Sequence, residues 1–216
     1  MTRTEHALAS FSILFVIGIA ACSGRVPPAS PATTASPEAA PPTQRVVGPL
    51  SEADAAALAT MNDRLKSYVA LHNKLEAALP KLPAEATPVQ RDAVQRQFEK
   101  ELRSARAGAK QGDMFTPQAQ PVIKRLIAAV FDGPEGQKLK SSIMDENPVG
   151  VKLVINGRYP DNVPISTMPP PVLQTLPKLV EGLEYRFVND HLILLDVHAH
   201  IVADFIDNVL PATVKP

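Results

Sequence analysis

The sequence predicts an α+β protein, in which an N-terminal helical bundle of about four helices precedes a small antiparallel β meander of three to four strands. Between residues 51 and 146, apolar side chains recur at every third or fourth position, the spacing of one buried helix face. After residue 147 the period changes to two, and turn-forming residues separate short apolar runs. We expect a signal peptide (1–21), a tether (22–49), a helical region (50–146), a β module (147–209) and a tail (210–216).

The first segment has the features of a lipoprotein signal peptide. Arg3 supplies a positive charge, and the apolar run at 11–19 is shorter than the roughly 20 residues of a membrane-spanning helix. The tetrapeptide Ile19-Ala20-Ala21-Cys22 resembles the lipobox of bacterial lipoproteins. The resemblance implies cleavage before Cys22, with diacylglycerol on its sulfur and an acyl group on its amine. The alternative is an ordinary signal peptide with an incidental cysteine.

The same resemblance implies a location. Two or three acyl chains bury enough CH₂ groups to anchor a protein stably in a membrane. Ser23 stands where an aspartate commonly signals inner-membrane retention, so analogy with lipoprotein sorting favours the outer membrane of a Gram-negative bacterium, facing the periplasm. Cys22 is the only cysteine, and its lipidation would leave no thiol for disulfides, metal ligation or catalysis.

The segment that follows Cys22 is predicted to be a disordered tether. Residues 25–49 contain seven prolines among Ala, Ser and Thr, without an apolar period. Such a composition buries too little apolar surface to offset the entropy of ordering, and it favours extended conformations. We expect this segment to hold a folded body away from the membrane.

Four helices are predicted from start and stop signals. Ser51 and Thr87 are N-cap candidates, and Gln90 completes a capping box with Thr87. Prolines follow the first helix at 80 and 83, and Thr116-Pro117 repeats the start signal of the second helix. The first helix is expected over 51–79. The second begins at Thr87, has its last apolar stripe residue at Ala105 and is broken by Gly112 and Asp113. The third and fourth are expected over 116–131 and about 135–146.

One face of the first helix carries the candidate contact surface, formed by Leu58, Met61, Leu65 and Tyr68. This seam predicts self-association or binding of an envelope protein partner, but at barely three heptads an intramolecular contact is favoured. His72 continues the same face, where it could be a ligand or a proton-sensitive switch. A histidine at the edge of the core is the favoured interpretation.

The β module is predicted to contain strands at 149–155, 185–188, 192–197 and 201–206, with one or two helical turns at 171–176. The run at 192–197 is nearly all apolar, which indicates a central strand covered on both faces. Asn156-Gly157 and Asn189-Asp190 are turn signals.

These residues carry a second resemblance. The stretch LEYRFVNDHLILLDVHAHIVADFI is similar to the C-terminal module of an uncharacterised group of bacterial secreted proteins. It also resembles small periplasmic domains of unknown function and, more distantly, the periplasmic nickel/cobalt homeostasis domain family. GDMFTPQAQPVIKRLI and DENP extend the resemblance to about residues 50–210. It implies an architecture and a location, but no reaction.

Asp196-x-His198-x-His200 is the candidate metal site. In a continuous strand the period of two would place all three side chains on one face, where they could bind a divalent metal. The argument against this site is that residues 198–200 must turn the chain if the next strand is to pair. Polar residues at an exposed turn are common in hairpins.

Three functions remain open. Net charge is zero and tryptophan is absent, which argues against nucleic-acid binding. No catalytic or cofactor-binding signature is present, so a non-enzymatic protein without a cofactor is favoured. The leading hypothesis is a membrane-anchored periplasmic lipoprotein with a binding or scaffold role at the cell envelope. The second is a periplasmic metal-binding or metal-homeostasis protein, and the third is a periplasmic hydrolase with an unidentified site.

Overall fold

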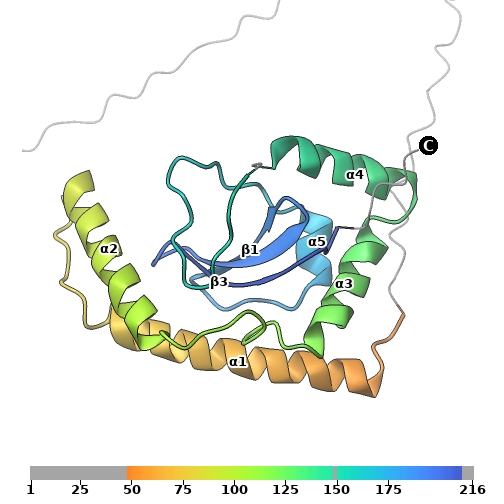
Figure 1. Cartoon of the computed structure of the whole chain (residues 1–216), viewed down its shortest axis with the longest axis horizontal. Coiled ribbons are helices and arrows are strands. Elements are labelled where there is room, and N and C mark those ends of the chain that lie inside the picture. The colour runs from red at the N-terminus through yellow and green to blue at the C-terminus, as the bar shows by residue number, and fades with distance from the viewer. Residues whose placement is uncertain (1–47, 148–149, 211–216) are drawn as a thin grey trace, which may run out of the picture. The chain divides into compact units, whose positions relative to one another are not determined.

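The computed structural model describes residues 48–147 and 150–210, all within one compact unit. Within these residues the fold is α+β, with five helices and one three-stranded antiparallel sheet (Figure 1). The elements are α1 (Glu52–Glu76), α2 (Pro88–Ala105), α3 (Ala119–Val130), α4 (Gly133–Glu146), α5 (Pro170–Thr175), β1 (Leu183–Val188), β2 (His191–Asp196) and β3 (Ile201–Ile206). The predicted signal peptide, the lipidation site Cys22, the tether up to residue 47 and residues 211–216 of the tail lie outside the described residues.

Local capping signals determine where the helices begin. The Ser51 hydroxyl accepts the backbone N–H of Asp54 at 3.1 Å, and α1 begins at Glu52, directly after this N-cap, as predicted. The capping box of Thr87 and Gln90 is present at the start of α2. α3 begins later than predicted, at Ala119, whose N–H is 3.3 Å from the Thr116 hydroxyl. No helix in the described part of the chain is long and apolar enough to cross a membrane.

The three strands form a meander in the order β1-β2-β3, with β2 in the centre as predicted. The side chains of β2 are buried on both faces of the sheet. Leu192 and Leu194 belong to the main core, whereas Ile193 and Leu195 belong to a smaller core on the opposite face. Asn189 adopts a positive φ of 54° in the turn between β1 and β2.

The predicted strand at 149–155 is wrong for its described part, because residues 151–155 form no strand. Val151 and Leu153 pack instead on the smaller core, which explains their alternation. Backbone hydrogen bonds to β3 and to the residue before it begin at Asn156. The Asn156 N–H donates to the Val202 carbonyl, and the Tyr159 N–H donates to the His200 carbonyl. The alternating apolar pattern therefore covers a face of the sheet rather than extending its edge.

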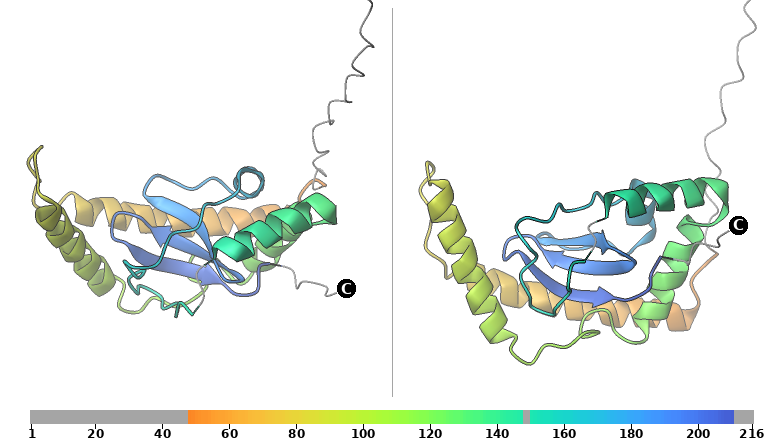
Figure 2. Two further views of the ribbon diagram at one scale, coloured as in Figure 1. Left: turned by 90° about the horizontal axis from the view of Figure 1, so that it is seen from above. Right: turned by 45° about the horizontal axis from the view of Figure 1, so that its top comes forward.

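The helices and the sheet share the main hydrophobic core. Leu58, Met61, Leu65 and Tyr68 of α1 are buried in it together with residues of α3 and of all three strands. Figures 1 and 2 show α1 running along the sheet. The predicted seam therefore packs within the chain, in agreement with the intramolecular alternative. Each part covers the apolar surface of the other, so the predicted helical region and β module share the main core.

Candidate functional site

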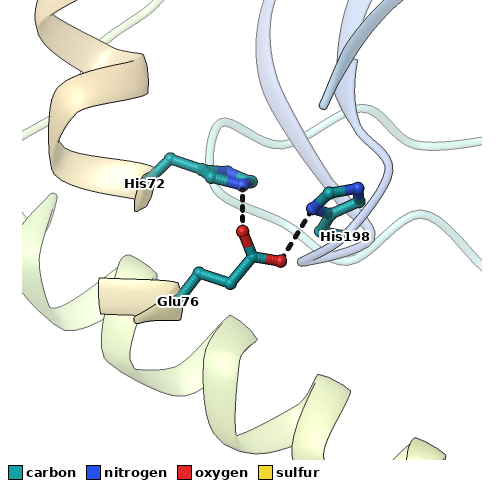
Figure 3. A group of neighbouring side chains, drawn as sticks. All are labelled: His72, Glu76 and His198. Carbon is teal, nitrogen blue, oxygen red and sulfur yellow. Dashed lines mark ion pairs between the residues drawn. The ribbon is translucent and has the colours of Figure 1, made fainter. Parts of the chain in front are cut away.

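The last turns of α1 and the turn between β2 and β3 bring three metal-ligand side chains together. His72 and Glu76 are four residues apart on α1 and therefore lie on one face of the helix. His198 lies in the turn that follows β2. One ligand atom from each of the three side chains lies within 4.8 Å of the others (Figure 3). We call this group the His72 cluster.

Glu76 lies between the two imidazoles of the cluster (Figure 3). Its Oε2 is 3.4 Å from Nε2 of His72, and its Oε1 is 2.8 Å from Nδ1 of His198. The His72 side chain is only 3% exposed, whereas Glu76 is 42% exposed and His198 is 43% exposed. The cluster therefore has one buried member and opens to solvent on the side of the other two.

Asp196, the last residue of β2, contacts two members of the cluster, His72 and His198. Its Oδ2 lies 2.6 Å from Nδ1 of His72 and accepts a hydrogen bond from the Tyr68 hydroxyl, also at 2.6 Å. Its Oδ1 accepts the backbone N–H groups of His198 at 3.1 Å and Ala199 at 2.8 Å. The same carboxylate thus orients the His72 ring and shapes the turn that carries His198.

This arrangement assigns the tautomer of His72. A carboxylate only accepts hydrogen bonds, so Nδ1 of His72 carries the hydrogen that points to Asp196. In the neutral ring, Nε2 then presents its lone pair toward Glu76. Histidines that bind metals characteristically donate their other ring N–H to a carboxylate, which fixes the ring and raises its basicity.

The electrostatic surroundings of His72 are mixed. Burial lowers the pKa of His72, but the hydrogen bond and charge of Asp196, together with the charge of Glu76, outweigh burial and raise it above its usual value. Burial and the Asp196 charge both raise the pKa of Tyr68, so Tyr68 remains a hydrogen-bond donor. The Arg106 guanidinium lies 4.8 Å from the centre of the Tyr68 ring, so a cation lies near the buried carboxylate of Asp196.

The donor set fits a divalent transition metal ion. Two imidazole nitrogens and one carboxylate are ligands that zinc, nickel, cobalt and iron accept in proteins. The helical spacing of His72 and Glu76 is the i, i+4 spacing that lets two ligands from one helix share a metal. Asp196 supplies the outer-shell contact that such sites commonly have.

The structure does not bring the three predicted metal ligands, Asp196, His198 and His200, together in one group. Asp196 contacts His198 by accepting its backbone N–H. Its other oxygen accepts a hydrogen bond from Nδ1 of His72, and Asp196 is not a member of the His72 cluster. His200 lies apart from them, with its Nε2 3.5 Å from the Asp161 carboxylate and its ring edge-on to Tyr159. β2 ends at Asp196 and the chain reverses over residues 197–200, so the period of two does not continue to His200.

Sequence reasoning did not group His72 with Glu76. His72 continued the apolar face of the first helix, and this favoured its interpretation as a histidine at the edge of the core. The available signal was the His-x-x-x-Glu spacing at the end of that helix. It gains meaning only when the turn after β2 brings His198 beside it.

A second buried carboxylate, Asp204, has a structural role. Its oxygens accept the backbone N–H groups of Gly112 at 2.9 Å and of Met114 and Phe115 at 2.8 Å each, as well as its neighbour's N–H. Burial raises the pKa of Asp204, and these four hydrogen bonds oppose that rise. Asp204 therefore fixes the loop before α3 to β3 and is not part of the His72 cluster.

Comparison of the chain with protein-family models, curated proteins and solved structures gives no match. The resemblance to periplasmic domains stays a prediction, and the functional argument rests on the geometry of the site.

Proposed function

We propose that this protein binds a divalent transition metal ion through His72, Glu76 and His198, and that lipid on Cys22 anchors it to the outer membrane, facing the periplasm. The observation that carries the metal proposal is the meeting of three ligand atoms within 4.8 Å, with Asp196 hydrogen-bonded to the buried histidine. The Ile19–Cys22 lipobox supports the anchor.

The geometry favours metal binding over a scaffold role based on the seam of α1. The scaffold hypothesis used the face formed by Leu58, Met61, Leu65 and Tyr68, and these side chains are buried in the protein's own core. Exposing them to a partner would require the core to open. The His72 cluster, in contrast, needs no rearrangement of the core to meet an ion from solution.

The contributions of the three ligands differ. His72 provides Nε2 from a buried ring that is already oriented by Asp196, so little rotamer freedom is lost on binding. Glu76 supplies a negative charge, and His198 adds a ligand from the turn after β2. A bound ion would connect the C-terminal part of α1 to the sheet and would stabilise the folded state.

The first test is thermal unfolding of the full-length chain, purified in detergent, with and without Zn(II), Ni(II) or Co(II). An ion at 100 times its dissociation constant adds about 2.7 kcal/mol to the free energy of unfolding. We expect this gain in the wild type and its loss in Glu76→Gln and His198→Gln. His191→Gln is the matched control, because His191 lies at the opposite end of β2 and pairs with Asp207. Equal stabilisation of all four proteins would refute the site.

The anchor has a separate test. Mass spectrometry of the mature N-terminus is expected to find a diacylglyceryl thioether and an N-acyl group on Cys22. Cys22→Ser should then release the protein from the membrane fraction. An unmodified chain cleaved at another position would contradict the anchor but would leave the metal proposal intact.

A further inference from the structure

We infer that a metal ion in the His72 cluster keeps one coordination position for a small monodentate ligand from solution, either water or an anion that displaces it. This inference rests on the proposed metal binding and concerns the ligand that occupies the fourth coordination position of the ion. The three side chains supply three ligands, whereas the metals that suit them take four or more. The remaining ligand must come from another part of the chain, from another molecule or from solution.

Asp196 is a further carboxylate in contact with His72, and its hydrogen bonds exclude it as the fourth ligand. Oδ2 is shared by His72 and Tyr68, and Oδ1 is shared by the N–H groups of His198 and Ala199. Because Asp196 meets the Nδ1 side of the His72 ring, it lies away from Nε2. Turning it toward the ion would leave four buried or half-buried donors without an acceptor, at a cost of about 1–3 kcal/mol for each one.

Three other described residues that lie against the His72 ring, Phe98, Tyr68 and Gly182, offer no ligand. Phe98 packs edge-on at 4.9 Å between ring centroids and has no donor atom. The Tyr68 hydroxyl donates its hydrogen bond to Oδ2 of Asp196. Gly182 lies against the Cε1–Nε2 edge of the ring, where an added Cβ would be 3.4 Å away, and its carbonyl accepts the N–H of Val197 at 3.0 Å.

The residues outside the described ranges add few ligand candidates. In residues 22–47, 148–149 and 211–216, the only side chains of Cys, His, Asp or Glu are those of Cys22 and Glu38. A lipidated Cys22 has no thiolate. Glu38 is therefore the one side chain outside the described ranges of the mature chain that an experiment must exclude.

The solvent exposure of two members of the cluster would let a ligand from solution reach the bound ion. Glu76 and His198 are each more than two-fifths exposed, while His72 lies beneath them. An ion held by all three would therefore face solvent on one side. Three protein ligands with an exchangeable fourth are characteristic of catalytic zinc sites, whereas structural sites have four protein ligands.

The test uses Co(II) as the metal and azide as the probe. The mature, lipidated chain in detergent is loaded with Co(II), its visible absorption is recorded, and azide is titrated. We expect a saturable spectral change that corresponds to one azide for each bound Co(II). Glu38→Gln should give the same response as the wild type, and His191→Gln serves as the matched histidine control. A Co(II) spectrum that does not respond to azide would overturn the inference.

Two further outcomes would also overturn it. If Glu38→Gln responds to azide and the wild type does not, the tether supplies the fourth ligand. If Co(II) produces a dimer in sedimentation experiments and azide changes the spectrum only after dilution, a second copy supplies it. Failure of the proposed function looks different, because the Co(II) spectrum itself would then be absent or would persist unchanged in Glu76→Gln and His198→Gln.

Discussion

Replacing Asp196 by Asn tests the role assigned to this residue, because Asn has nearly the same shape but can donate hydrogen bonds. Oδ1 of Asp196 accepts two backbone N–H groups, so the amide oxygen of Asn should occupy that position. Its NH₂ group would then face Nδ1 of His72. His72 could accept that hydrogen bond only by moving its own hydrogen to Nε2, which would remove the lone pair available to a metal.

The expected effect follows from this change of tautomer. Loss of an outer-shell partner typically lowers metal affinity by about 10–100-fold, which corresponds to about 1.4–2.8 kcal/mol in binding free energy. The fold should persist, because the amide oxygen keeps the two backbone contacts of the turn. Competition against a chromophoric chelator measures the affinity, and nitrogen chemical shifts of His72 report the tautomer.

Tyr68→Phe is the matched control for this experiment. It removes the other donor to Oδ2 of Asp196 but leaves the His72 contact and its tautomer in place. We expect the metal affinity of Tyr68→Phe to stay within about threefold of the wild type, a difference of less than 1 kcal/mol. An Asp196→Asn protein with the altered tautomer but with wild-type affinity would refute the reasoning. Equal losses in the two variants would also refute it.

The remaining predictions concern the fold around the site. Met61→Ala should lower the free energy of unfolding by about 2–5 kcal/mol in denaturant titrations, because Met61 is fully buried; a change of oligomeric state in sedimentation would contradict its intramolecular packing. Thr87→Ala should cost about 1 kcal/mol through loss of the capping box of α2, measured in the same way; Ser67→Ala, which leaves every cap in place, serves as its control. Burial, helped by the charge of Arg158, lowers the pKa of His200. The unfolded chain therefore binds the proton on His200 more tightly than the folded chain does. As a result, the free energy of unfolding falls as the pH drops from about 6.5 toward the folded-state pKa. His200→Asn keeps a residue type that tolerates the positive φ of 56° and should flatten this part of the stability–pH curve; an unchanged curve would contradict the assignment.

The sequence by itself determined the elements whose energies are local. Ser51 and the Thr87–Gln90 box specify helix starts because their side chains bond to backbone groups only three residues away. The apolar run at 192–197 predicted the central strand, because strands covered on both faces carry nearly continuous apolar sequences. The α+β class followed from the helical spacing before residue 147 and from the short apolar runs, separated by turn residues, at 185–206.

Only the tertiary structure decided the site and the edge of the sheet. His72 and Asp196 are 124 residues apart, and no local pattern reports a hydrogen bond between residues so distant. The alternation at 149–155 fits a paired strand and a chain segment lying on a sheet face equally well, and packing selected the second. The period of two that connected Asp196 with His200 ended where β2 turned, because a reversal of the chain changes the direction of each following side chain. Ligand geometry arises from such long-range packing, so the residues of the His72 cluster could be recognised only after the chain was folded.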